Sequence, residues 1–337
     1  MPYAEERRIA IEAVEKASFL CRAVQTDLVA AASMDKQDKS PVTVADFGAQ
    51  AVVTHLLRGA FPDLPLVGEE DAAALREPSN RALADQVVAH VEAHVEAHAV
   101  GETVPGLGFA EVLDLIDYGT YGGGASGRHW TLDPIDGTKG FLRMDQYAVA
   151  LALIEDGEVV LGVLGCPNMP VAAASEGERG CLFVAVKGEG AFQRALSGGA
   201  EQPVRVTDVS QTEKANFCES VEAAHSSQSD SAQVAGLLGI TADPFRIDSQ
   251  CKYGAVSRGE ASIYLRLPTR KDYEEKIWDH AAGAIVVREA GGKVTDVMGR
   301  ELDFSLGRTL RNNSGVIVTN GVLHEPVIAA VRKVLAV

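Results

Sequence analysis

Apolar residues recur every three or four positions near the start of the chain. The periodic segment covers residues 5 to about 33, and its apolar positions are Ile9, Ile11, Val14, Ala17, Leu20, Cys21, Val24 and Leu28. This spacing places the apolar side chains on one face of a helix. The pattern therefore predicts a long amphipathic helix that packs one face against the rest of the protein.

A second segment with helical spacing begins after Pro41 and stops near Phe61-Pro62. Thr43 stands three residues before Asp46, as the hydroxyl and the acidic residue of a capping box do. The sequence thus predicts a second helix, in which Asp46 has a capping role in the first turn.

Two apolar, β-rich runs between Tyr147 and Cys166 flank the pair Asp156-Gly157. An Asp-Gly pair favours the tight turn that joins two antiparallel strands. We therefore expect a buried β-hairpin at this point.

Helical and strand-like segments alternate in the second half of the chain. Strands are predicted at residues 204–206 and 263–267, and a helix from about 278 to 290, which Gly291-Gly292 ends. The mixture of helices with antiparallel strands indicates an α/β (α+β) protein with mixed sheets.

The length of 337 residues suggests two domains, or one large domain with two sub-cores. The most suitable boundary is near residues 207–213. It divides the chain into an N-terminal α+β domain, 1–207, and a C-terminal α/β domain, 208–337.

Charge restricts the partners that this surface can bind. Lys and Arg number 31 and Asp and Glu 47, a formal net charge of −16. This balance argues against binding to nucleic acid or to an anionic membrane, so an anionic ligand must be held by a local feature.

The chain lacks an apolar run of the roughly 20 residues that a membrane helix needs, and no signal peptide is recognisable, so we expect a cytoplasmic protein. The five Cys residues are scattered, which indicates reduced thiols in the core.

The segment from Trp130 to Phe141 carries the densest chemical signal. In it, a strand-like entry leads to Asp133-Pro134-Ile135-Asp136-Gly137-Thr138 and then to a potential helix. Carboxylates are ligands that Mg²⁺ prefers, and backbone amides after Asp136 could face a phosphate. The alternative is an ordinary Asp-Gly turn in which Asp136 caps a helix.

Four more acidic residues have two interpretations. Glu69 and Glu70 follow a short apolar stretch, Asp46 lies near a predicted helix start, and Asp279 precedes the predicted helix at 278–290. Each carboxylate could simply favour the N-terminal end of a helix. Capping and metal binding are compatible, because one carboxylate oxygen can serve each purpose.

In combination, these motifs resemble the lithium-sensitive inositol monophosphatase superfamily. The resemblance rests on four sites: Asp46, Gly68-Glu69-Glu70, Asp133-Pro134-Ile135-Asp136-Gly137-Thr138 and Trp278-Asp279-His280-Ala281-Ala282-Gly283. Other segments resemble the 3′(2′),5′-bisphosphate nucleotidase branch: Asp38-Lys39-Ser40-Pro41-Val42-Thr43, Gly127-Arg128-His129-Trp130, His225-Ser226-Ser227, Asp248-Ser249-Gln250-Cys251-Lys252-Tyr253 and Tyr264-Leu265-Arg266-Leu267-Pro268.

The resemblance implies a layered αβαβα sandwich of the sugar-phosphatase type, with a metal site in the cleft between its halves. It implies two or three Mg²⁺ ions, held by Glu69, Asp133, the carbonyl of Ile135, Asp136 and Asp279. Asp46 and Thr138 would orient and deprotonate the attacking water, and Glu70 would assist. Most of the metal ligands then belong to the N-terminal domain, and the last belongs to the C-terminal domain.

The resemblance also implies the contacts to the substrate. Gly137 and Thr138 would bind phosphate oxygens through their amides, and the nucleotide would contact His225, Ser249, Lys252, Arg266 and Asp279. Lys252 and Arg266 suit a second phosphate as a point charge and a bidentate fork. Without the resemblance, each would be taken for a solvated surface charge.

The implied reaction is Mg²⁺-dependent hydrolysis of the 3′-phosphate of adenosine 3′,5′-bisphosphate to AMP by a monomeric, Li⁺- and Na⁺-sensitive enzyme of sulfur assimilation. 3′-Phosphoadenosine 5′-phosphosulfate is expected as a second substrate. The alternatives are an inositol polyphosphate 1-phosphatase and a catalytically silent nucleotide or ion sensor.

His90, His94 and His98 form a ladder at helical spacing that could ligate zinc. The ladder is far in sequence from every motif above. Adventitious affinity for nickel or zinc is therefore the preferred interpretation.

Overall fold

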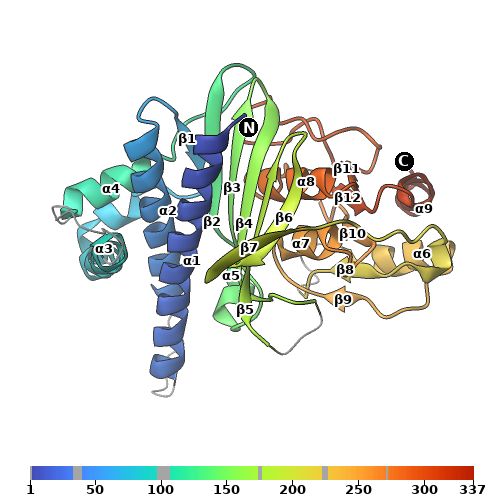
Figure 1. Ribbon diagram of the computed structural model, residues 1–337, viewed down its shortest axis with the longest axis horizontal. Helices are drawn as coiled ribbons and strands as arrows, with labels where there is room; N and C mark the ends of the chain where they lie inside the picture. The colour runs from blue at the N-terminus through green and yellow to red at the C-terminus, as the bar shows by residue number, and fades with distance from the viewer. Residues whose placement is uncertain (1, 33–39, 97–106, 174–176, 222–226, 271) are drawn as a thin grey trace.

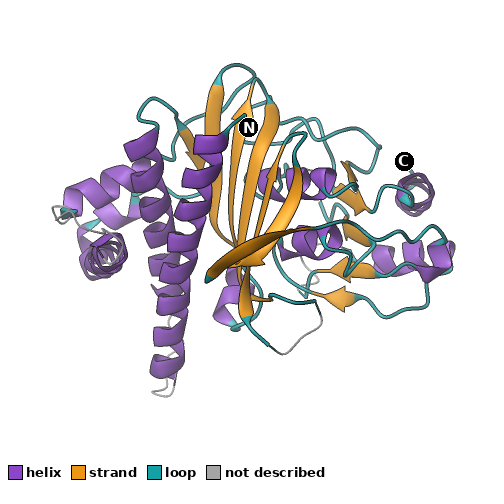
Figure 2. Ribbon diagram, viewed as in Figure 1, coloured by secondary structure: helices purple, strands orange, loops and turns teal. Residues whose placement is uncertain are grey.

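A computed structural model describes residues 2–32, 40–96, 107–173, 177–221, 227–270 and 272–337. Two mixed sheets and several layers of helices make up the fold (Figures 1 and 2). The larger sheet has seven strands in chain order: β1 (Leu66–Gly68), β2 (Arg128–Asp136), β3 (Ala148–Glu155), β4 (Glu158–Pro170), β5 (Arg179–Val186), β6 (Gly190–Ala195) and β7 (Gly198–Pro203). β1 is parallel to β2, and every later neighbouring pair is antiparallel.

The predicted hairpin is the centre of this sheet. β3 and β4 pair antiparallel across Asp156-Gly157, whose φ angles are 50° and 80°. Two successive positive φ angles are those of a type I′ turn, which matches the twist of the strands that it joins. Both strands are buried along most of their length, as their apolar sequences require.

The smaller sheet has five strands in the order β11-β12-β10-β8-β9. Their bounds are β8 (Phe217–Glu219), β9 (Phe245–Arg246), β10 (Ile263–Arg266), β11 (Lys293–Thr295) and β12 (Val316–Thr319). β10 is antiparallel to β12 and parallel to β8. The strand predicted at residues 263–267 is therefore present and ends one residue earlier.

Helices cover both faces of each sheet. α1 (Ala4–Ala32) and α2 (Ser40–Ala60) lie on one face of the large sheet, with α3 (Arg81–Glu96) and α4 (Phe109–Asp117) packed against α2 (Figure 1). α7 (Cys251–Ser257) and α8 (Ala281–Glu289) fill the space between the two sheets. The far face of the small sheet is covered by α6 (Gln228–Leu238) and α9 (His324–Leu335). This order confirms the layered αβαβα arrangement, with buried apolar clusters in the layers between sheets and helices.

Three details of the predicted elements need correction. α2 begins at Ser40, so Thr43 and Asp46 lie inside the helix and do not cap it. No strand forms at residues 204–206, because β7 ends at Pro203 and the Val206 amide donates to the Ala290 carbonyl at the end of α8. α8 is shorter than predicted, and residues 278–280 form a turn before it.

None of the helices in the described ranges is both long and apolar enough to cross a membrane. All five cysteines are free and buried, as the sequence predicted.

Candidate active site

Parallel pairing of β1 and β2 brings two acidic motifs to the same edge of the large sheet. Leu66 is in register with Trp130, and Gly68 with Leu132. The Glu69 amide continues the ladder by donating to the Leu132 carbonyl at 3.2 Å. Because the carboxyl ends of parallel strands meet at one edge, Glu69 lies beside the end of β2.

The end of β2 is irregular where its two aspartates stand. The pairing with β3 shifts register between Asp133 and Asp136, which takes Ile135 out of the regular ladder. Gly137 then has a φ of 93°, and a Cβ there would lie 2.8 Å from the Cβ of Ser249. Glycine thus permits both the left-handed turn and the close approach of a distant segment. Thr138 begins the short helix α5 (Thr138–Leu142) directly after this turn.

α2 supports this edge with two polar residues one turn apart. Asp46 is only 9% exposed, and Gln50 is completely buried. The Gln50 side chain accepts from the Glu70 amide at 3.2 Å and donates to the carbonyls of Glu70 and Ile116 at 2.7 and 2.8 Å. Gln50 therefore fixes the backbone that carries the paired glutamates.

Arg308 joins the same loop to the second half of the chain. Its guanidinium donates to the carbonyls of Gly68 at 2.6 Å and Gly119 at 3.2 Å. The same group lies over the ring of Trp278, 4.7 Å from the centroid. Because Asp279 follows Trp278, this contact brings the segment that carries Asp279 to the Glu69 loop.

Gln250 makes the second connection between the halves. Its amide donates to Asp136 Oδ2 at 2.5 Å, and its side chain donates to the Trp278 carbonyl at 2.8 Å. The side-chain oxygen accepts from the Gly283 amide at 3.0 Å. One buried residue therefore holds the end of β2 against the start of α8.

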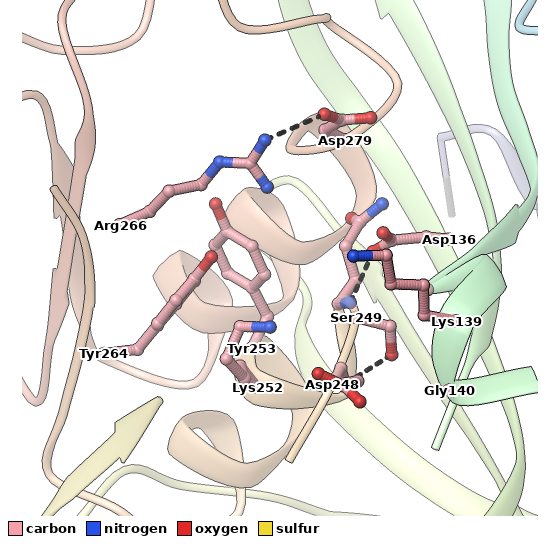
Figure 3. Close-up of a pocket in the computed structure, with 12 residues that line it drawn as sticks. Asp136, Lys139, Gly140, Asp248, Ser249, Lys252, Tyr253, Tyr264, Arg266 and Asp279 are labelled. Atoms are coloured by element: carbon pink, nitrogen blue, oxygen red, sulfur yellow. Dashed lines mark hydrogen bonds and ion pairs between the residues drawn. The ribbon is translucent and has the colours of Figure 1, made fainter. Parts of the chain in front are cut away.

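A cavity of about 430 Å³ lies between these elements. Its lining includes Glu69, Asp133, Ile135, Asp136, Gly137, Thr138, Arg266 and Asp279. A small recess of about 20 Å³ adjoins it and shares Asp136, Gly137, Lys139, Arg266 and Asp279 (Figure 3). The recess adds Ser249 and Lys252. Every predicted site residue that the structure describes lines the cavity or the recess, except Asp46 and Glu70. Both of these lie close enough to Glu69 for their charges to interact with it. His225 lies outside the described residues.

The carboxylates of the cleft repel one another. Burial, together with the nearby charges of Asp279 and Glu70, raises the pKa of Glu69 to about 8. Burial and Asp71 raise the pKa of Glu70 to about 7. Burial and Asp279 raise the pKa of Asp136 to about 6. The pKa values of Asp133 and Asp46 are also raised, mainly by burial and secondly by neighbouring glutamates.

This donor set fits hard divalent cations. Oδ1 of Asp133 is buried without a hydrogen-bond partner among the described residues. Clustered carboxylates with raised pKa values are stabilised by a cation, which supplies the missing positive charge. The donor set of this site is therefore suited to divalent metal ions.

We expect the metal-free protein to lose stability as the pH rises from about 5 to about 8. In the unfolded chain these carboxyl groups have pKa values near 4, so over this interval the native state binds more protons than the unfolded state. The free energy of unfolding must then fall with increasing pH. Urea unfolding of EDTA-treated protein at several pH values measures this slope.

The matched variants are Glu69→Gln, which removes one of these groups, and Glu77→Gln, which changes an exposed side chain. The slope should flatten in the first variant and stay as in the wild type in the second. Equal slopes in all three proteins would contradict the electrostatic account.

Basic side chains accompany the acidic ones in the recess, where Lys139, Lys252 and Arg266 lie beside Asp136, Asp248 and Asp279. Lys252 is only 4% exposed, and its Nζ lies over the Tyr264 ring, 5.1 Å from the centroid. Burial lowers the pKa of Lys252, although the charge of Asp136 opposes this shift. Ser249 has a φ of 65°, and its hydroxyl donates to the Asp248 carbonyl at 2.5 Å. A buried cation beside an open recess is suited to binding an anion.

Several residues that hold the site in place were not identified from the sequence. Gln50, Gln250 and Arg308 join segments that lie far apart in the chain. Gln250 lies within the segment Asp248-Ser249-Gln250-Cys251-Lys252-Tyr253, which carries part of the family resemblance, whereas no local pattern marks Gln50 or Arg308.

The chain matches the sequence pattern of the inositol monophosphatase family over residues 3–336. It belongs to this family. Relatives named 3′(2′),5′-bisphosphate nucleotidase occur in Emericella nidulans (48% identity, 99% of each chain covered) and Schizosaccharomyces pombe (45%, 99% of this chain and 97% of the relative). The relative from Arabidopsis thaliana, named 3′(2′),5′-bisphosphate nucleotidase 1, is 48% identical over 100% of this chain and 98% of its own.

Solved structures of the family agree in fold. The inositol monophosphatase from Anabaena has a TM-score of 0.62 at 19% identity, with 99% of this chain and 97% of the other covered. For the Thermotoga maritima IMPase the TM-score is 0.61 at 20% identity, with 98% of both chains covered. The resemblance stated from the motifs is therefore confirmed at the level of family and fold.

Proposed function

We propose that this chain is a Mg²⁺-dependent phosphatase that converts adenosine 3′,5′-bisphosphate to AMP by hydrolysing the 3′-phosphate. The observation that carries the proposal is the pairing of two charge environments in one cleft. A carboxylate cluster suited to cations adjoins a recess whose wall carries Lys252 and Arg266. The names of the relatives support the same substrate class.

In this proposal, Glu69, Asp133, the Ile135 carbonyl, Asp136 and Asp279 hold two or three Mg²⁺ ions. Bound Mg²⁺ supplies a water of lowered pKa and charge that offsets the negative charge of the reacting phosphate. The protein contributes fixed ligand positions, because Gln250 holds Asp136 and Arg308 holds the backbone before Glu69.

Proton transfer is assigned to Asp46, Thr138 and Glu70. The Thr138 hydroxyl orients the attacking water, accepts its proton and passes its own proton to Asp46, while Glu70 assists from the loop after β1. Burial of Asp46 beside two glutamates raises its pKa, which makes it a better proton acceptor than an ordinary aspartate. The amides of Gly137 and Thr138 bind oxygens of the 3′-phosphate.

The second phosphate, at the 5′ position, is assigned to the recess. Lys252 and Arg266 supply its positive charge, and Ser249, His225 and Asp279 complete the contacts to the nucleotide. Recognition of two phosphates distinguishes this substrate from a simple phosphomonoester. 3′-Phosphoadenosine 5′-phosphosulfate has an anionic group at the same end and is proposed as a second substrate.

The test is phosphate release from adenosine 3′,5′-bisphosphate, 3′-AMP and inositol 1,4-bisphosphate, each with Mg²⁺, with EDTA, and with Mg²⁺ plus LiCl. We expect the first substrate to be preferred, EDTA to abolish release, and Li⁺ to inhibit. A preference for the inositol phosphate would replace the nucleotide assignment by an inositol polyphosphate phosphatase. Absence of release from every substrate, with Mg²⁺ binding retained, would favour a catalytically silent sensor.

We also predict a cytoplasmic location, a monomeric state, a role in sulfur assimilation and a division of the chain at residues 207–208. Ultracentrifugation tests the oligomeric state.

A further inference from the structure

Arg266 forms ion pairs with two carboxylates, and the surroundings of these carboxylates differ. One guanidinium nitrogen lies 2.8 Å from Glu275 Oε2 and 3.3 Å from Asp279 Oδ2. Figure 3 shows the Arg266 side chain extending from β10 toward Asp279 across the recess. Asp279 is a proposed metal ligand, so its charge would be shared with the cations once they bind. Glu275 is then the partner that stays available to Arg266.

Glu275 is itself fixed from two sides. Its carbonyl accepts from the Leu310 amide at 2.8 Å, which ties the backbone to a neighbouring segment. Its Oε2 lies 3.1 Å from Nε2 of His280, a residue with no exposed surface. Nδ1 of the same ring lies 2.7 Å from the Tyr253 hydroxyl.

These contacts fix the His280 ring with Nε2 as the donor to Glu275. The Glu275 carboxylate can only accept, so Nε2 must carry the proton that it donates. Burial alone would raise the pKa of Glu275, but the hydrogen bond from His280 and the charge of Arg266 outweigh it and lower the pKa to about 2.

Glu275, Asp279 and His280 also stand close enough to suggest a metal site of their own. Both ring nitrogens of His280 are used by Glu275 and Tyr253, and the Glu275 oxygen is used by Arg266. No ring nitrogen is left for a metal ion. The contacts instead form a chain from Tyr253 through His280 and Glu275 to Arg266.

We propose that Glu275, fixed by His280, is a positioning residue that holds Arg266 in the recess for the second phosphate while Asp279 serves the cations. The inference rests on the proposed function, because it takes the recess as the site of the 5′-phosphate. Glu275 and Asp279 are the two acidic partners of the Arg266 guanidinium, so without Glu275, Asp279 would remain. Arg266 would then turn toward the metal ligands and leave the phosphate.

The test compares Glu275→Gln with Glu274→Gln, the same change at an exposed neighbour. For each protein, kcat and KM are measured with adenosine 3′,5′-bisphosphate and with 3′-AMP, which lacks the second phosphate. We expect Glu275→Gln to raise the KM for the bisphosphate roughly tenfold, as loss of a charge-assisted contact does, with a much smaller change for 3′-AMP. Glu274→Gln should behave as the wild type.

A rise in KM of equal size for both substrates would show that Glu275 acts on the metal site or the fold, and would overturn the inference, as would an unchanged KM. The double variant Glu275→Gln/Arg266→Gln removes both charges of the ion pair. It leaves neither charge buried without its partner, so it can be measured even if Glu275→Gln alone does not fold. Compared with Arg266→Gln alone, it should show no further loss of preference for the bisphosphate; a further loss would contradict the inference. If the wild type itself does not prefer the bisphosphate to 3′-AMP, the proposed second-phosphate site fails, and this result is visible before any variant is made.

Discussion

Replacing Asp133 with Asn is expected to lower kcat for adenosine 3′,5′-bisphosphate by about a thousandfold or more. Asp133 is 2% exposed at the end of β2, and its Oδ1 is buried without a hydrogen-bond partner among the described residues. Loss of outer partners of metal ligands already costs roughly 10- to 100-fold, so loss of a ligand should cost more. Steady-state kinetics at saturating Mg²⁺ measures the effect.

The fold of Asp133→Asn should be retained, because the change keeps the size of the side chain and removes a buried charge from a cluster of like charges. Circular dichroism and thermal unfolding check this. The control is Asp114→Asn, the same change at a side chain that is 69% exposed on α4. Activity of Asp133→Asn within tenfold of the wild type would contradict its assignment as a metal ligand.

Replacing Lys252 with Met is expected to raise the KM for the bisphosphate roughly 10- to 100-fold, the range for losing a hydrogen bond to a charged group. Lys252 is buried beside the recess, and Met can occupy a similar volume against the Tyr264 ring. The KM for 3′-AMP should change much less, because that substrate has no second phosphate. Kinetics with both substrates separates the two effects.

Lys187→Met is the matched control, because Lys187 is 52% exposed and pairs only with the exposed Glu158 among the ion pairs of the described chain. It should leave both KM values unchanged. If Lys252→Met affects both substrates to the same extent, Lys252 supports the cleft as a whole and the second phosphate is bound elsewhere.

The acidic motifs could be predicted from the sequence because each is local. Asp133 and Asp136 stand three residues apart at the end of one strand, and a glycine follows them. Glu69 was ambiguous from the sequence alone, since three consecutive acidic residues also suit an exposed loop. Parallel pairing of β1 with β2 places it in the cleft.

The supports of the site could not be predicted, because their partners are distant in sequence. Gln250 contacts Asp136 and Trp278, and Arg308 contacts Gly68. Such contacts depend on how sheets and helices pack, which periodicity and local motifs do not encode. Glu275 is a further example, since only the fold places it against Arg266 and His280.

The errors in the predicted elements have the same origin. Asp46 has the spacing of a capping residue, but α2 extends back to Ser40 and places it inside the helix, facing the glutamates. Residues 204–206 have strand-forming side chains, yet the Val206 amide pairs with the end of α8. In both cases tertiary contacts outweigh the local preference.

The central claim is that the cation cluster acts on the 3′-phosphate while Lys252 and Arg266 hold the 5′-phosphate. The most direct test is to identify the nucleotide formed when the wild-type protein acts on adenosine 3′,5′-bisphosphate with Mg²⁺, by chromatography against authentic 5′-AMP and 3′-AMP. We expect 5′-AMP and one equivalent of phosphate. Formation of 3′-AMP would show that the 5′-phosphate occupies the metal site and would contradict the account.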